Sequence, residues 1–213
     1  MKKLLIGVLV LAGLVIGGDA AARVVAEHRV ADELRSSFGL SEKPSVSIDG
    51  WPFLIHLVDG KFPQVTCTAS NVSKAGITFS QVSVVLHGVH FPFPRALTGG
   101  HGTMRAARGS GTVELTGPDL THALQAHNIP LSVTFSGGHM TVSSSTTGVG
   151  LEAPLSLDGA SLQIGPVQTS ATTIGPFHLE LPTVVDGFNY ASAHIADDKV
   201  VLTLGIRNKS FTF

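Results

Sequence analysis

The sequence predicts an α+β fold in which a strongly curved antiparallel sheet wraps a long N-terminal helix, giving an elongated molecule with two further short helices. Charged residues make up only 14% of the 213 residues and glycine occurs 24 times, which disfavours a helical bundle with a charged surface. Apolar and polar residues alternate along most of the chain, as in strands with one apolar face. One segment near the N-terminus carries apolar residues at helical spacing instead.

The chain opens with a segment typical of export. Lys2-Lys3 precedes the apolar run Leu4–Gly17, and small residues follow, among them Ala20 and Ala22. The run is shorter than the roughly 20 residues of a membrane-spanning helix, which favours a signal peptide cleaved after Ala22 or Ala20. The alternative is an uncleaved membrane anchor, because no helix breaker follows the run. We therefore interpret residues 1–22 as a signal peptide or membrane anchor, and expect the protein in the periplasm or on the outer face of the cytoplasmic membrane.

Residues 23–213 are expected to form a single domain, since their number supports one substantial core. The one cysteine, Cys67, rules out an internal disulfide. It falls on the apolar side of an alternating segment, which indicates a buried, inert thiol.

Three helices are expected. The first covers Arg23 to Phe38 and presents one apolar face formed by Val24, Ala31, Leu34 and Phe38. Proline at a first helical position predicts the two short ones. They follow the prolines at positions 52 and 118, as residues 53–58 and 119–125.

Period-two alternation predicts the strands. Its phase changes between Phe79 and Val82, which predicts a β-bulge there. A curved sheet can bury its apolar face by wrapping the first helix, and an incompletely filled interior would leave an elongated apolar groove. The alternating segments are residues 46–48, 65–69, 77–79, 113–115, 131–135, 149–157, 177–181 and 200–206.

Charge is unevenly distributed along a chain whose net charge is only -1. Five basic and no acidic residues lie from Lys61 to Arg108, whereas Gly109 to Asp198 contains acidic residues and neither lysine nor arginine. The basic block is too sparse, and the total charge too close to neutral, for a nucleic-acid-binding protein.

One segment carries a recognisable pattern, VSIDGWPFLIHLVDGKFPQVT from Val46 to Thr66. It contains a glycine, an aromatic residue, Pro-Phe-Leu, a short helix, a second glycine, and a strand that alternates valine with threonine. This pattern resembles the signature of the LmeA-like phospholipid-binding family of actinobacterial envelope proteins. Weaker similarity lies in Gly111–Thr116 with Asp119-Leu120, in Leu181-Pro182, and in Asp197–Thr203.

The resemblance implies an elongated fold of the tubular-lipid-binding type, in which sheet and helix enclose an acyl chain. It implies a role in binding or moving glycerophospholipid during envelope biogenesis or maintenance. It brings no catalytic residues and no cofactor. The alternative is a non-catalytic structural or scaffold protein of the envelope whose core is filled.

An acyl chain gains about 0.8 kcal/mol for each methylene group removed from water, so an apolar groove suffices to bind one. The alternative for each candidate side chain is ordinary core packing. The candidates for the groove wall are Trp51, Phe53, Leu54, Leu57, Phe62, Phe79, Phe135, Phe177 and Phe188.

A phospholipid headgroup carries a phosphate, which arginine binds well. The glycine- and proline-rich stretch from Phe91 to Gly111 is expected to form the groove mouth, or else a solvated loop. Contacts to the headgroup or to a membrane surface are predicted for Arg95, Arg105, Arg108, Phe91 and Phe93.

Two other chemistries are disfavoured. His87 and His90 lie three residues apart on an alternating segment, so their side chains point to opposite faces. The stretch from Lys61 to Arg108 contains no acidic residue that could complete a metal site with them or with His101. The sequence Gly109-Ser110-Gly111 lacks the outer residues of a hydrolase nucleophile elbow. We predict neither a metal site nor an enzyme.

Overall fold

The fold is described from a computed structural model that covers residues 2–91, 103–144, 150–168 and 173–212; the side chains of residues 2–15, 167–168, 173–174 and 211–212 lie outside the description. Within these residues the chain is α+β, which confirms the predicted class. The helices are α1 (Lys2–Ser37), α2 (Phe53–Asp59) and α4 (Gly117–Ala126).

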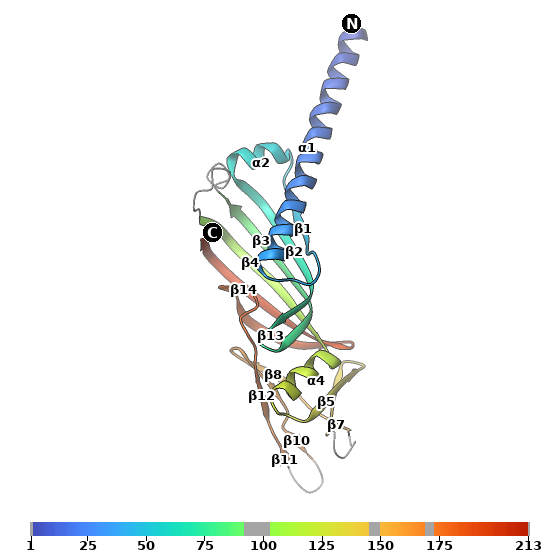
Figure 1. Cartoon of the computed structure of the whole chain (residues 1–213), viewed down its shortest axis with the longest axis vertical. Helices are drawn as coiled ribbons and strands as arrows, with labels where there is room; N and C mark the ends of the chain where they lie inside the picture. The colour runs from blue at the N-terminus through green and yellow to red at the C-terminus, as the bar shows by residue number, and fades with distance from the viewer. Residues whose placement is uncertain (1, 92–102, 145–149, 169–172, 213) are drawn as a thin grey trace.

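A six-stranded antiparallel sheet forms the body of the molecule (Figure 1). Its order is β1-β2-β3-β4-β14-β13, so β1 and β13 are its edges. Its strands are β1 (Ser45–Ile48), β2 (Lys61–Lys74), β3 (Ile77–His90), β4 (Thr103–Thr116), β13 (Asn189–Ala196) and β14 (Lys199–Thr212).

Three small antiparallel sheets and α4 lie at the end of the molecule opposite α2 (Figure 1). The first has the order β5-β6-β7, the second β12-β9-β8, and the third pairs β10 with β11. Their strands are β5 (Leu131–Ser136), β6 (His139–Ser144), β7 (Gly150–Glu152), β8 (Leu155–Asp158), β9 (Ser161–Ile164), β10 (Val167–Gln168), β11 (Thr173–Ile174) and β12 (Phe177–Glu180).

The large sheet does not wrap α1, and the expectation of a strongly curved sheet around the helix is wrong. The sheet is open, and α1 contacts it at one end, through β1 and α2 (Figure 1). The physical reason is that other elements cover the apolar face. Side chains from α4 and the small sheets pack on β3, β4 and β14, so the helix is not needed to bury them.

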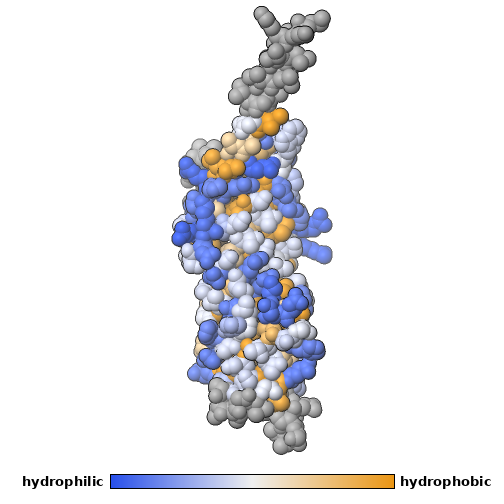
Figure 2. Space-filling model, turned by 90° about the vertical axis from the view of Figure 1, so that its right-hand side faces the viewer, coloured by the Kyte–Doolittle hydropathy of each residue, from blue (hydrophilic) through white to orange (hydrophobic). Residues whose placement is uncertain are grey.

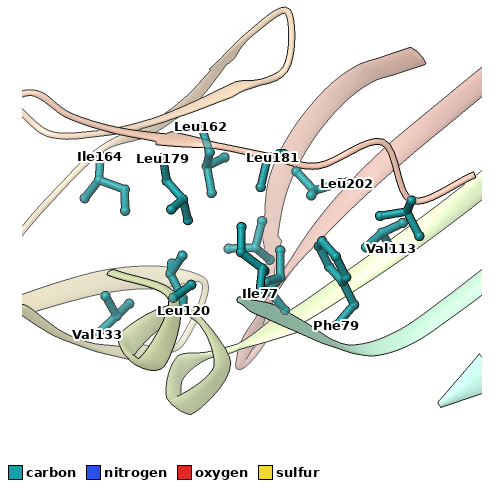
Figure 3. Close-up of a cluster of buried hydrophobic side chains, with 14 of the residues drawn as sticks. Ile77, Phe79, Val113, Leu120, Val133, Leu162, Ile164, Leu179, Leu181 and Leu202 are labelled. Atoms are coloured by element: carbon teal, nitrogen blue, oxygen red, sulfur yellow. The ribbon is translucent and has the colours of Figure 1, made fainter. Parts of the chain in front are cut away.

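The buried apolar residues form two clusters. The main cluster joins the large sheet to α4 and the small sheets, and Figure 3 shows Phe79, Leu120, Leu162 and Leu202 pointing toward a common interior from β3, α4, β9 and β14. The α1 cluster lies under the helix at the other end of the sheet. Its buried members are Ala31, Val46, Ile48, Phe53, Phe62 and Val89.

The face of α1 that docks on the sheet differs from the predicted one. Ala31 is buried and Leu34 packs against the α1 cluster, but Val24 and Phe38 are 51% and 63% exposed. Small side chains let the helix backbone approach β1 closely, and two of them, Ala22 and Ala26, are missing from the predicted face. The small residues against the cluster are Ala22, Ala26 and Ala31.

Both short helices are confirmed, with local sequence that explains their ends. Pro52 lies at the N-cap of α2, and Gly60 ends the helix with a φ of 65°. At α4, Thr116 and Asp119 form a reciprocal capping box.

No bulge lies between Phe79 and Val82, so that prediction is wrong. The β2–β3 register is the same on both sides of the phase change: Val72 pairs with Phe79, and Ser70 pairs with Gln81. Between them Asn71 has a φ of 52°, a left-handed conformation that asparagine tolerates. The alternation therefore changes phase without an inserted residue.

Candidate functional site

A strip of apolar side chains crosses the large sheet between the two clusters. One row of paired residues spans all six strands, as Tyr190, Leu204, Gly111, Val84, Cys67 and Val46. The next row on the same face is Ile206, Gly109, Leu86, Val65 and Ile48. We call these two rows the apolar strip.

The middle of the apolar strip is only half-buried. The strip residues on β2 and β3 are partly exposed, whereas the residues that form the cores of the two clusters on either side are buried. These partly exposed residues are Val65, Cys67, Val84 and Leu86. Leu86 packs against both clusters. The apolar face is therefore continuous from one end of the sheet to the other, and it is least covered in the middle.

The strip has a low-polarity environment at two places in its first row, at Cys67 on β2 and at Tyr190 on the edge strand β13. Burial raises the pKa of the Cys67 thiol, and burial raises the pKa of Tyr190 to about 12. The Tyr190 hydroxyl donates a hydrogen bond of 2.8 Å to the carbonyl oxygen of Pro182. Both groups are neutral at physiological pH, so the row presents no charge to an acyl chain.

A basic hollow adjoins the strip. It has a volume of about 680 Å³ and is lined by His87, Arg108, Arg207 and Lys209, together with Gly109, Ser110, Gly187, Asn189, Gly205 and Ile206. No acidic residue is among these lining residues. The hollow shares Gly109 and Ile206 with the apolar strip.

The hollow lies where β14 becomes an edge of the sheet. β13 begins at Asn189, which pairs with Gly205, and beyond this pair no described residue pairs with β14 on that side. His87, Arg108 and Arg207 form one row across three strands. Like charges directly opposite one another destabilise a sheet, so an anion bound in the hollow would relieve this repulsion.

The predicted groove residues fall into two groups. Phe53 and Phe62 are buried in the α1 cluster and Leu57 packs against it, whereas Trp51 and Leu54 are exposed at the same end. The others lie at the main cluster: Phe79 and Phe188 are buried in it, and Phe135 and Phe177 pack against it half-buried. The structure therefore does not bring the nine residues together in one wall.

Phe135 lines a second hollow, of about 510 Å³, beside the start of α4. Its polar lining includes Thr116, Thr121, His122 and Asp198. It contains none of the other predicted groove residues.

The predicted headgroup residues are also divided. Arg105 and Arg108 lie exposed on β4, which begins at Thr103, so the expected loop from Phe91 to Gly111 is in part a strand. The reason is that this segment pairs with β3 on one side and β14 on the other. Phe91 packs half-buried against the α1 cluster. Arg95, Phe93 and His101 lie outside the described residues.

Sequence reasoning missed Arg207 and Lys209 in the hollow and Cys67 in the strip. The two basic residues lie beyond the basic block in sequence, and only the pairing of β14 with β4 places Arg207 beside Arg108. A signal for Arg207 and Lys209 as site residues was their position in a strand that follows the acidic half of the chain and is long enough to extend past its neighbour β13.

A polar clamp attaches α1 to the segment before and within α2. The Asp19 carboxylate accepts hydrogen bonds of 2.9 and 2.8 Å from the backbone N–H groups of Phe53 and Leu54. The Arg23 guanidinium donates to the carbonyl oxygen of Gly50, and Glu27 accepts a 2.8 Å bond from the N–H of Ile48. Asp19 is buried although it is charged, so it is a structural part of the folded domain.

Asp19→Asn is expected to weaken this clamp in a pH-dependent way. Hydrogen bonds from Leu54 and Phe53 hold the pKa of Asp19 below its ordinary 3.8, so its stabilisation is complete above that pH and is lost as the pH falls through the lowered pKa. Thermal unfolding should show the variant a few degrees less stable at neutral pH, with the difference closing in acid. Glu33→Gln is the control, since Glu33 is exposed and its carboxylate accepts a hydrogen bond from the Ser37 hydroxyl. A difference that is constant with pH would contradict the assignment.

None of the helices, as far as their side chains are described, is long and apolar enough to cross a membrane.

Comparison with known proteins identifies the family. No curated protein matches the chain, and no solved structure matches it. A sequence model of one family, described as LmeA-like phospholipid-binding, matches residues 17–200. This range contains α2, the apolar strip on β1 to β4, and Asp19 of the clamp. Because the match covers most of the chain, the protein belongs to the LmeA-like phospholipid-binding family.

Proposed function

We propose that this protein binds glycerophospholipid outside the cytoplasm, with an acyl chain on the apolar strip and the headgroup phosphate in the basic hollow, and that it serves the biogenesis or maintenance of the cell envelope by carrying lipid. Membership of the family supports phospholipid as the ligand. The export-type segment Leu4–Gly17 supports the location.

The observation that carries the proposal is the half-buried apolar strip, together with the cations Arg108 and Arg207 that lie one residue away on the opposite face of the sheet, at the β14 edge. An acyl chain on Val65, Cys67, Val84 and Leu86 would complete the cover that the clusters provide on either side. Its headgroup would lie around the β14 edge, where Arg108, Arg207 and Lys209 offer charge-assisted hydrogen bonds to phosphate. Arg95, Arg105, Phe91 and Phe93 remain predicted contacts to the headgroup or membrane.

The first test is lipid extraction of the purified full-length protein followed by mass spectrometry. Phospholipid in a stoichiometric amount supports the proposal. No lipid, even after incubation with phospholipid vesicles, would favour the alternative of a scaffold protein with a filled core. Transfer of labelled lipid between donor and acceptor vesicles then distinguishes a carrier from a receptor.

The single cysteine allows a direct test of the strip. Bound phospholipid should slow the reaction of Cys67 with a maleimide by about tenfold when the lipid is at ten times its Kd, because only the free fraction reacts. The raised pKa of the thiol calls for a mildly alkaline buffer. As a control, a cysteine at exposed Ser73, in a Cys67→Ser background, should react equally fast with and without lipid. Unchanged Cys67 labelling in a preparation that contains lipid would place the acyl chain elsewhere.

The basic hollow is tested by the double variant Arg108→Ser/Arg207→Ser. Its affinity for anionic phospholipid should fall by about tenfold at low salt, with a smaller loss at high salt, because two exposed cations no longer meet the phosphate. Lys74→Ser, which removes a cation at the far end of β2, is the control and should bind like the wild type. Equal affinities for the double variant and the wild type at low salt would exclude the hollow as the headgroup site.

A further inference from the structure

Large apolar side chains are exposed in one region only of the described chain. All of those that are exposed lie between Ile16 and Val58: on α1, at Phe38 directly after it, or on the segment that contains α2. The space-filling view shows apolar surface at the end of the body from which α1 projects (Figure 2). A concentration of this kind marks an interaction surface.

The segment around α2 carries a well-defined apolar face. Trp51, Leu54, Ile55 and Val58 are 72%, 41%, 57% and 77% exposed. Leu54, Ile55 and Val58 have the spacing of one helix face, which points away from the α1 cluster, where the buried Phe53 lies. Trp51 directly precedes Pro52, the N-cap residue of α2. A tryptophan beside aliphatic residues on a short helix is typical of a membrane-water interface.

The apolar start of α1 leaves the body at the same place. α2 lies beside α1 at the end of the sheet, and the N-terminal part of α1 extends beyond both (Figure 1). Leu4–Gly17 is apolar, and the helix from Lys2 to Gly18 is about 25 Å long at 1.5 Å per residue. This length is comparable to the ~30 Å hydrocarbon core of a bilayer.

The polar clamp fixes the apolar face of α2 relative to the N-terminal part of α1. Asp19 directly follows Gly18, and its carboxylate holds the N–H groups of Phe53 and Leu54 at the start of α2. The apolar face of α2 is therefore at the depth at which α1 would leave a bilayer. Lys61 follows Gly60, the residue that ends α2, and lies beside His90 and Arg105 in one row of the sheet. This row suits an anionic lipid surface.

We infer that α2 rests on the surface of the bilayer that holds the N-terminal segment of α1, with Trp51, Leu54, Ile55 and Val58 in the interface. The clamp requires Asp19, so the mature protein retains this residue, and cleavage after Ala20 or Ala22 does not occur. The body is thereby held at a fixed orientation to the membrane. This docking surface does not depend on a lipid in the apolar strip.

Intact-mass measurement of the exported protein, isolated from membranes, tests retention of the segment. A mass that includes residues 2–19 supports the inference, and a chain that begins at Ala21 or Arg23 overturns it.

The only tryptophan, Trp51, reports on docking. The full-length protein is reconstituted in phosphatidylcholine vesicles with phosphatidylglycerol, and the lipids are then replaced by brominated analogues. Trp51 emission should fall by about twofold, because the indole lies within the interface. The triple variant Leu54→Ser/Ile55→Ser/Val58→Ser should lose this quenching and become more accessible to acrylamide, without a loss of fold, since all three side chains are exposed.

A matched control keeps the α2 face and removes apolar surface elsewhere on the exposed flank of α1. Val30→Ser/Phe38→Ser changes two exposed side chains, one farther along α1 and one directly after its end, and should be quenched like the wild type. Trp51 emission that is insensitive to brominated lipid in the reconstituted wild type would overturn the inference. Cys67 protection, measured on the same samples, reports separately on the strip, so failure of docking and failure of lipid binding are distinguished.

Discussion

Replacing Phe79 with alanine is expected to destabilise the protein by about 3–5 kcal/mol, the largest effect of a single substitution that we predict. Phe79 is fully buried in the main cluster, where α4 and the small sheets meet the large sheet (Figure 3). The substitution removes the ring and leaves a cavity in a region that the surrounding strands cannot close. Urea denaturation followed by circular dichroism measures the loss as a lower transition midpoint.

Phe38→Ala is the matched control for this experiment. The same side chain is removed at a position that is 63% exposed after the end of α1, so the change in stability should stay within about 0.5 kcal/mol. The comparison also tests the role of Phe79 as a predicted groove residue. If Phe79→Ala were as stable as the Phe38 variant and bound phospholipid less well, Phe79 would line a lipid site and not the core.

The second large effect is expected at Gly109, which lies in the apolar strip. A Cβ atom at this position would approach Ile206 Cγ2 to 2.5 Å, Phe188 Cζ to 2.8 Å and Leu86 Cδ2 to 2.9 Å. Three side chains, on β14, on β3 and directly before β13, would have to move together. Gly109→Ala should therefore cost about 1–3 kcal/mol through overpacking, seen as a lower urea midpoint.

Gly205→Ala is the control for Gly109→Ala. Gly205 is on β14, paired with Ser110 beside Gly109, and a Cβ atom there meets nothing within 4 Å. The variant should be neutral or slightly more stable, because alanine reduces the conformational freedom of the unfolded chain. Equal losses in both variants would mean that strand glycines, and not the convergence of side chains at Gly109, set the stability.

Much of the fold could be predicted from local sequence, because local physics determines it. Proline and glycine at its two ends mark α2, and Thr116 with Asp119 marks the start of α4. The alternation of the strands follows from one apolar face. Which elements cover that face depends instead on packing between distant parts of the chain. For this reason the sequence predicted that the sheet wraps α1, whereas α4 and the small sheets cover its apolar face.

The candidate site was less predictable for the same reason. Arg207 lies beside Arg108 because β14 pairs with β4, across about half the length of the chain. No local pattern carries that information. The docking face of α1 was predicted only in part, since Ala31 and Leu34 lie on it but Val24 and Phe38 do not. Ala22 and Ala26, which permit close approach, weigh little in an apolar pattern that larger residues dominate.

The four hydrogen bonds between α1 and the segment from Ile48 to Leu54 all end on backbone atoms of that segment. The polar clamp therefore does not depend on the identity of the outward-facing side chains of this segment. Evolution can exchange Trp51 or Leu54 to suit a membrane of another composition while the attachment stays intact. A protein engineer can likewise give this end of the molecule a new binding specificity without redesigning the helix that supports it.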